Sequence, residues 1–282
     1  MRPNEPWLDL DDEFSNDLQT KAELLRDHRD QVFVEEHASR PAQREVLSRV
    51  SETLVDLHAD LFSIDGSRLH VRPTNHSHEL ASETYPPLET AARCVQEDLV
   101  VMEERTCGWC LTAAAVCFPT RWNLPSKLGL PMGAIHDRVP GYREQLDVSA
   151  NRFFDGMKPG SVFRRGNWSL MDDPALFQPE GKLRDDVRSD LDASNAGEKI
   201  WLRVEHQTLQ RLPETGAVLF GIRIHRTRLD RVAREPTVAR LLIEAIDTMP
   251  AEMQLYKSLG VVRSATNEYL ERVIETGEAE SA

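Results

Sequence analysis

The stretch from Trp201 to His225 constrains the fold most, because it has the pattern of two strands joined by a tight turn. Each half alternates apolar with polar residues, as the two-residue period of a strand requires, and residues 213–216 supply turn chemistry between them. If both apolar rows face one core, four polar side chains share the opposite face: Arg203, Glu205, Gln207 and Arg223. This hairpin is the first candidate site. The plain alternative is a solvated sheet face with cross-strand ion pairs.

The composition is that of an ordinary globular protein. The chain has 282 residues, of which 40% are hydrophobic, enough for a sizeable core. Its 34 basic and 47 acidic residues give a formal charge of -13, which disfavours nucleic acid or an anionic membrane as the main partner. No apolar run approaches the length of a membrane span, and the start through Asp12 is too polar for a signal peptide. We therefore expect a cytoplasmic protein.

The cysteines suggest a redox or metal site that their context does not support. Cys107-Gly-Trp-Cys110 has the spacing of redox dithiols, in which a helix N-terminus activates the first thiol. Here an apolar, strand-like run follows directly, and no second pair of ligands repeats the spacing for zinc. The alternative, which Cys94 and Cys117 share, is free thiols in a reducing compartment.

Helical patterns alternate with strand patterns along the chain. Helices are expected after Pro41, over Leu88–Arg105, over Tyr142–Met157, and over two C-terminal segments, Pro236–Met249 and Ala251–Leu270. Strands are expected near five positions: Arg68, Leu111, Ser161, Ile200 and Ala217. This order predicts an α+β fold with one antiparallel sheet and helices packed largely on one side of it.

A long connection that ends near Gly141 is rich in proline and glycine but too apolar for disorder, so it should wrap over a packed surface. It carries His136 in mostly apolar surroundings. A structural histidine is the ordinary explanation, yet a lone imidazole against an apolar wall also suits the axial ligand of haem. His76 and His78 lie in a polar segment and are read as exposed loop histidines, with ligand binding as the alternative.

Arg164 and Arg165 lie side by side in the strand-like run Ser161–Met171. They are either edge-strand protection or ligands for an anion such as a carboxylate. No glycine-rich phosphate loop, nucleophile elbow or dinucleotide fingerprint occurs. The residues alone therefore predict a cofactor or ligand pocket between the sheet and the Trp122–Gly141 loop.

A series of ordered short motifs is more specific than any one of them. The series comprises Gln96-Glu97-Asp98-Leu99, Leu111-Thr112-Ala113, Phe118-Pro119-Thr120-Arg121-Trp122, Lys127-Leu128-Gly129, Ala134-Ile135-His136, Val139-Pro140, Arg165-Gly166-Asn167-Trp168-Ser169, Arg203-Val204-Glu205, Gln207-Thr208-Leu209, Arg211-Leu212-Pro213, Ile222-Arg223 and Tyr256-Lys257. In this order the motifs resemble the haem-dependent oxidative N-demethylase family. The resemblance implies a PAS-like fold that holds haem b. It suggests an N-terminal helical extension over residues 1–62, a haem-binding core over 63–235, and C-terminal helices over 236–282.

The same resemblance implies an activity and partners. The expected reaction is oxidative demethylation of a small methylated amine such as dimethylamine by dioxygen, with release of formaldehyde. Electrons would come from a flavin and iron–sulfur reductase, and formaldehyde would pass to a partner subunit that binds tetrahydrofolate. The alternative is a non-catalytic haem- or ligand-binding PAS-type sensor or regulatory protein, because one fold supports many functions. A third reading is a protein of this fold without haem.

Roles for single residues also follow from the resemblance. His136 is the expected axial ligand of the haem iron, and the haem propionates would be bound by Arg165, Arg203 and Arg223. Glu205 is the expected anion that holds the protonated amine, with Gln207 as its polar neighbour. The chain departs from the family pattern at His206, usually arginine, and at His225, usually aromatic. Either histidine is therefore a competing candidate for the iron ligand, or the chain takes a different amine.

Overall fold

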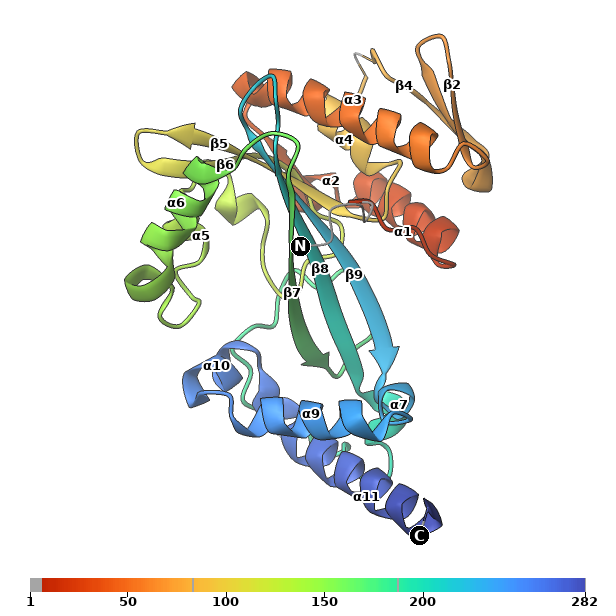
Figure 1. The fold of residues 1–282 in the computed structure, drawn as a ribbon, viewed down its shortest axis with the longest axis vertical. Helices are drawn as coiled ribbons and strands as arrows, with labels where there is room; N and C mark the ends of the chain where they lie inside the picture. The colour runs from red at the N-terminus through yellow and green to blue at the C-terminus, as the bar shows by residue number, and fades with distance from the viewer. Residues whose placement is uncertain (1–6, 83, 187, 282) are drawn as a thin grey trace.

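A six-stranded antiparallel sheet forms the centre of the molecule, in the order β1-β6-β5-β9-β8-β7 (Figure 1). We describe it from a computed structural model, which covers residues 7–82, 84–186 and 188–281. The strands are β1 (Phe33–Glu35), β5 (Asp98–Arg105), β6 (Gly108–Ala115), β7 (Val162–Met171), β8 (Trp201–Arg211) and β9 (Val218–Arg228). The expected α+β class and the antiparallel sheet are confirmed.

Helices cover both faces of this sheet, although the sequence favoured one face. On one face, Leu99 and Val101 of β5 share a core with α1 (Phe14–Asp27), α3 (Arg40–Leu57) and α4 (Pro87–Ala92). On the other face, Val100 and Met102 share a core with α5 (Met132–Ile135) and α6 (Asp147–Gly156). The short elements α2 (Arg29–Val32), η1 (His37–Ser39), η3 (Pro125–Lys127) and η4 (Tyr142–Leu146) complete these layers. The central strand β5 is thus buried on both sides.

The expected helix over Leu88–Arg105 is wrong. Its first turns form α4, but the chain then extends into β5 from Asp98. A strand buried on both faces has an almost continuous apolar run, which a three- and four-residue spacing can match by coincidence. The helix expected over Tyr142–Met157 is confirmed in η4 and α6.

A second, three-stranded sheet lies beside the N-terminal helices. It contains β2 (Phe62–Asp65), β3 (Arg68–Val71) and β4 (His76–Glu79), in that order, with η2 (Arg72–Thr74) before β4. The strand expected near Arg68 is therefore present, but it belongs to this separate sheet. His76 and His78 lie on β4 and not in a loop, with ring centroids 6.4 Å apart.

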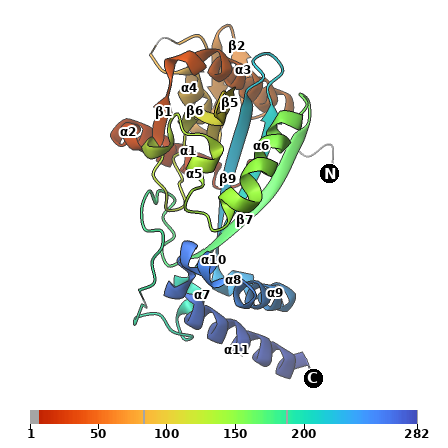
Figure 2. The same ribbon diagram turned by 90° about the vertical axis from the view of Figure 1, so that its left-hand side faces the viewer.

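The C-terminal helices pack around a core of their own at the far end of β7, β8 and β9 (Figures 1 and 2). They are α7 (Ala196–Lys199), α8 (Leu229–Val232), α9 (Pro236–Asp247), α10 (Ala251–Tyr256), η5 (Leu259–Val261) and α11 (Arg263–Ser281). The helix expected over Ala251–Leu270 is interrupted at Ser258, whose φ is 55°. Among the described helices, none combines the length and the apolar character needed to cross a membrane.

Candidate functional site

The pairing of β7 with β8 places polar side chains in a row on the sheet face that also carries α5 and α6. Glu205 pairs with Asn167 and Gln207 pairs with Arg165, so all four side chains point to the same side. The expected common face of Glu205 and Gln207 is therefore present, and Arg165 and Asn167 extend it onto the neighbouring strand.

Three side chains hold the carboxylate of Glu205. Thr120 Oγ1 donates to Glu205 Oε1 at 2.6 Å, while Gln207 Nε2 and Asn167 Nδ2 donate to Oε2 at 2.7 and 3.3 Å. We call these four residues the Glu205 cluster. A carboxylate offers about four acceptor positions, so one remains for another donor.

Gln207 adds a second acceptor beside Glu205. Its side chain is buried, and its Oε1 has no hydrogen-bond partner among the residues that the structure describes. A buried acceptor without a partner is costly and calls for an explanation, such as a ligand. Together, Glu205 and Gln207 offer neighbouring acceptors for a cation that carries N–H groups.

Two lysines approach the Glu205 cluster from distant parts of the chain. Lys257 Nζ donates to Asn167 Oδ1 at 2.9 Å and to the carbonyl of Trp168 at 2.7 Å. Lys182 Nζ donates to the Tyr256 hydroxyl at 2.9 Å and lies 4.1 Å from the centroid of that ring.

Burial dominates the electrostatics of these two lysines. It lowers the pKa of Lys182 to about 8 against the opposing charge of Glu205. Burial and the charge of Lys182 likewise lower the pKa of Lys257 to about 8. With Arg165 beside them, the cations outnumber the single carboxylate of the Glu205 cluster, an arrangement that suits an anionic group.

His136 lies at the C-terminus of α5, half-buried, with its ring stacked on Tyr142. Its Nδ1 lies 2.9 Å from the carbonyl of Met132. Burial lowers the pKa of His136, the bond to Met132 opposes this, and Arg165, Lys127 and Lys182 lower it further. The ring is therefore neutral at pH 7. When Nδ1–H donates to the carbonyl, the lone pair of Nε2 is available to a metal.

His136 and Glu205 surround the same group of cations. Lys182 influences the titration of His136 and is itself influenced by Glu205, and Arg165 influences both His136 and Lys257. The structure thus brings His136, Arg165, Glu205 and Gln207 to one side of the sheet, as the sequence predicted for these four residues.

Arg203 has a different role from the one predicted. Its side chain is 1% exposed and donates to the carbonyls of Phe118, Ala175 and Leu176 at 2.8 to 3.1 Å, and to Thr120 Oγ1 at 3.1 Å. These bonds occupy the guanidinium, so binding of a haem propionate does not fit this geometry. Arg203 instead fixes the backbone that positions Thr120.

Arg223 lies on the opposite face of the sheet, and its expected common face with Glu205 is wrong. Glu205 pairs with Ile224, whereas Arg223 pairs with His206. Arg223 is buried and forms ion pairs with Asp11 at 2.6 Å and Asp17 at 3.2 Å. The two aspartates therefore neutralise the charge of Arg223 within the protein. This does not agree with the predicted role of Arg223 as a partner of a haem propionate.

His206 and His225 also lie on the face opposite Glu205. Register places His206 beside Arg223, and His225 follows two residues later on the same side of β9. His136 lies on the same face as Glu205, because its neighbours Met132 and Ile135 pack in the core that contains Val100. Both His206 and His225 therefore point away from Glu205, although Gln207 of the Glu205 cluster lines the same cavity as His206.

Several residues of the site were missed from the sequence. Thr120, Asn167, Tyr256 and Lys257 lie within the short motifs, and only their position in a motif could have indicated them. Lys182 lies in the irregular segment between β7 and α7, where no local pattern marks it.

The cysteines lie apart from this site. Burial raises the pKa of Cys94 and Cys117 to about 12, so both thiols are unreactive at neutral pH. Cys107 lies in the turn between β5 and β6, and Cys110 follows on β6, with the two Sγ atoms 3.3 Å apart. Burial and the neighbouring Cys107 raise the pKa of Cys110 to about 11. Free thiols remain the simplest description.

A family model described as haem-dependent oxidative N-demethylase, alpha subunit-like, matches residues 1–266.

Proposed function

Because the chain belongs to the haem-dependent oxidative N-demethylase alpha subunit-like family, we propose that it oxidatively demethylates a small secondary amine such as dimethylamine. The observation that carries the proposal is the pair of neighbouring acceptors on Glu205 and Gln207. A protonated secondary amine has two N–H donors and one positive charge. The carboxylate matches the charge and one donor, and Gln207 Oε1 matches the other.

The residues on this face of the sheet fit a haem group. His136 offers a neutral, half-buried imidazole with Nδ1 engaged by a carbonyl, which is how haem and metal ligands are commonly oriented. In this proposal His136 would bind the haem iron, and Arg165, Lys182 and Lys257 would bind the propionates. Residues 63–235 would form the PAS-like core for haem b, residues 1–62 an N-terminal extension that adds helices and the edge strand β1 to it, and residues 236–282 a C-terminal extension.

The propionates of a bound haem would also balance the excess of positive charge around Glu205. Without an anion, Lys182, Lys257 and Arg165 would repel a cationic amine. Two propionates would neutralise these cations and leave Glu205 as the charge that attracts the amine. The cofactor and the substrate would therefore bind cooperatively through electrostatics.

Bound haem supplies the oxidation chemistry, while the protein binds and orients the amine. Thr120 and Asn167 fix the carboxylate of Glu205, so that it does not rotate away from the substrate. With both N–H groups held by Glu205 and Gln207, the methyl groups are the part of the amine that remains free to react. Overall, dimethylamine, dioxygen, two electrons and two protons give methylamine, formaldehyde and water.

Other subunits complete this reaction in our proposal. The alpha-subunit description of the family supports a multi-subunit enzyme. A flavin and iron–sulfur reductase would supply the electrons, and a tetrahydrofolate-binding partner would accept formaldehyde.

The first test is the visible spectrum of protein expressed with added haem. We expect a Soret band that is lost in His136→Ala and kept in the control His37→Ala, which removes an exposed histidine. A colourless protein would contradict haem binding.

The second test is formaldehyde release from dimethylamine with reductant and oxygen. Glu205→Gln should lower kcat/KM by about 100-fold, the cost of losing a charged hydrogen-bond partner, with an unchanged Soret band. A haem-loaded wild-type protein that releases no formaldehyde from any of a panel of methylamines would instead identify a haem-binding sensor or regulatory protein.

A further inference from the structure

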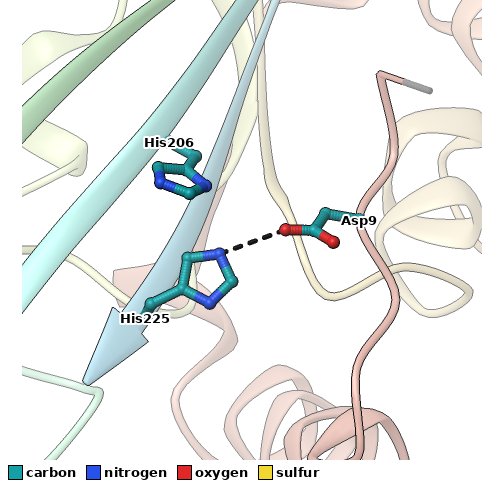
Figure 3. A group of neighbouring side chains, drawn as sticks. All are labelled: Asp9, His206 and His225. Carbon is teal, nitrogen blue, oxygen red and sulfur yellow. Dashed lines mark ion pairs between the residues drawn. The ribbon is translucent and has the colours of Figure 1, made fainter. Parts of the chain in front are cut away.

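Asp9, His206 and His225 form a compact group on the sheet face opposite the Glu205 cluster (Figure 3). The two histidines come from neighbouring strands, β8 and β9, and their ring centroids lie 4.6 Å apart at an angle of 59°. Asp9 comes from the segment before α1 and turns its carboxylate toward them (Figure 3). One ligand atom from each of the three side chains lies within 4.8 Å of the others.

The segment that carries Asp9 is held in place independently of the histidines. The backbone N–H of Asp9 donates to Glu97 Oε1 at 2.7 Å, and that of Asp11 donates to Gln96 Oε1 at 3.2 Å. Two residues before Asp9, Trp7 Nε1 donates to Thr53 Oγ1 at 3.0 Å. The carboxylate of Asp9 is therefore presented to β8 and β9 by a fixed backbone.

An ordinary ion pair accounts for only part of this group. Asp9 Oδ2 lies 3.2 Å from His225 Nε2, but this buried nitrogen makes no well-oriented hydrogen bond to any residue that the structure describes. His206 makes none within residues 7–82, 84–186 and 188–281, although it lies against His225. A neutral imidazole with a free ring nitrogen can donate a lone pair to a metal ion.

The spacing fits a transition-metal ion. Zinc bonds to histidine nitrogen and carboxylate oxygen at about 2.0 to 2.2 Å, which places tetrahedral ligand atoms about 3.3 Å apart. The present spread of up to 4.8 Å closes to that value with small side-chain rotations. Two imidazoles and one carboxylate are also the ligand set of three-ligand zinc sites that keep a fourth position open.

A second carboxylate stands behind His225. Asp11 Oδ2 lies 3.7 Å from His225 Nδ1, and Asp11 is itself held by Arg223 at 2.6 Å and by Gln96 Nε2 at 2.9 Å. Metal-ligating histidines commonly pair their other nitrogen with a carboxylate, which orients the ring and raises its basicity. Arg223, predicted at a propionate, thus positions the carboxylate behind His225.

The group also borders a cavity of about 600 Å³, whose lining includes Asp9, His206 and Arg223, and also Arg165 and Gln207. This space can hold water or a small ligand at a fourth coordination position.

We propose that Asp9, His206 and His225 bind one divalent transition-metal ion of the zinc class, separate from haem and on the other face of the sheet. The site joins the segment before α1 to β8 and β9. It does not depend on the proposed demethylase activity.

The test is a titration of the full chain, freed of metal by a chelator, with Zn²⁺ in competition with a chromophoric chelator. We expect one tight equivalent, with affinity reduced by about 100-fold in His206→Ala and in His225→Ala and by about 10-fold in Asp9→Asn. The matched control is His76→Ala on β4, which removes one of another close pair of histidines and should leave the affinity unchanged.

Co²⁺ gives an independent readout of the ligand set. We expect visible absorption of a tetrahedral or five-coordinate ion without a sulfur-to-cobalt band, which would instead indicate Cys107 and Cys110. His206→Gln serves as a second variant if His206→Ala is unstable. The Soret band of the haem-loaded protein should persist in both His206 variants. Unchanged Zn²⁺ affinity in the His206 and His225 variants, equal loss in His76→Ala, or a sulfur band would each overturn the proposal.

Discussion

The imidazole of His136 stacks on the ring of Tyr142, with centroids 4.4 Å apart and planes 14° from parallel. The stack and the bond of Nδ1 to Met132 together restrict the rotation of the imidazole. Tyr142→Ala should therefore weaken haem binding by about 10-fold, as loss of an orienting contact around a metal ligand does, while Tyr142→Phe should preserve it. Haem titration followed at the Soret band measures both.

Tyr142→Ala also removes buried volume, which needs its own control. Phe154→Leu reduces the same core without touching the stack. Equal haem affinity in Tyr142→Ala and wild type, or an equal loss in Phe154→Leu, would refute an orienting role for Tyr142.

Replacement of Gln207 by leucine tests the recognition of the amine. Gln207→Leu keeps the size of the side chain but removes two groups: the acceptor that would meet the second N–H of dimethylammonium and the Nε2–H donor to Glu205. The loss of one hydrogen bond in a charged network, about 1.5 to 3 kcal/mol, predicts a decrease in kcat/KM of about 10- to 100-fold. Trimethylammonium has one N–H group, so its kcat/KM should fall much less.

The control for this variant lies on the same strand. Gln210→Leu changes a buried glutamine on the other face of β8, where it accepts from Arg49. If Gln207→Leu lowers kcat/KM for dimethylamine and for trimethylamine by the same factor, Gln207 does not accept a hydrogen bond from the substrate.

Haem binding should weaken as the pH rises through about 8. Lys182 and Lys257 each have a pKa of about 8, because burial disfavours their charged forms. Below this pH both are charged and attract propionates, whereas above it they become neutral. In the haem-free protein the pH dependence of folding has the opposite sign. The unfolded chain, with lysine pKa values of about 10.4, binds more protons between about pH 8 and this value, so the penalty that the two buried lysines impose on folding becomes smaller as the pH rises.

The measurement is the haem dissociation constant across this range of pH. Lys182→Met and Lys257→Met should each lower affinity at neutral pH and flatten the dependence, whereas Lys199→Met, at an exposed lysine, should match wild type. If the pH dependence of the haem dissociation constant is the same in the Lys182 and Lys257 variants as in the wild type, Lys182 and Lys257 are not partners of the propionates.

Asp172 holds the segment that carries Lys182. Its side chain is 4% exposed and forms ion pairs with Arg121, Arg184 and Arg188. Burial raises the pKa of Asp172, but Arg121 and Arg184 lower it more, so the net pKa is lowered. Asp172→Asn leaves these arginines facing one another and should reduce the free energy of unfolding by about 3 kcal/mol.

Urea unfolding measures this change, and haem affinity should fall with it because Lys182 loses its anchor. Asp186→Asn is the control, since that exposed carboxylate pairs with Arg184 at the surface, where solvent screens the interaction, and the free energy of unfolding should change much less. If Asp172→Asn reduces the free energy of unfolding no more than Asp186→Asn does, the buried ion pairs of Asp172 do not hold this segment.

The hairpin of β8 and β9 was predicted in part from the sequence. Both strands and their turn were predicted correctly, as was the common face of Glu205 and Gln207. Alternation determines which residues of one strand share a face, but the pairing between strands depends on the turn. Because Glu205 pairs with Ile224, the odd-numbered residues of β8 lie beside even-numbered residues of β9, and Arg223 faces the other way.

The remaining differences have similar physical causes. The strand β5 was taken for a helix because it is buried on both sides and lacks a clear alternation. Lys182 reaches Glu205 only through tertiary folding, and no local pattern encodes such a contact. His136, in contrast, was predicted as the iron ligand from its apolar loop and the family motifs, and this role stays a prediction.

The ion pair between Asp11 and Arg223 joins residues 212 positions apart. Closing so long a stretch of chain costs entropy before any contact repays it, and such topologies fold slowly. The buried guanidinium of Arg223 cannot meet Asp11 until both ends of the core have come together. We therefore expect the order of assembly to matter in this protein: the sheet forms first, and the segment before α1 closes over β9 as a late step.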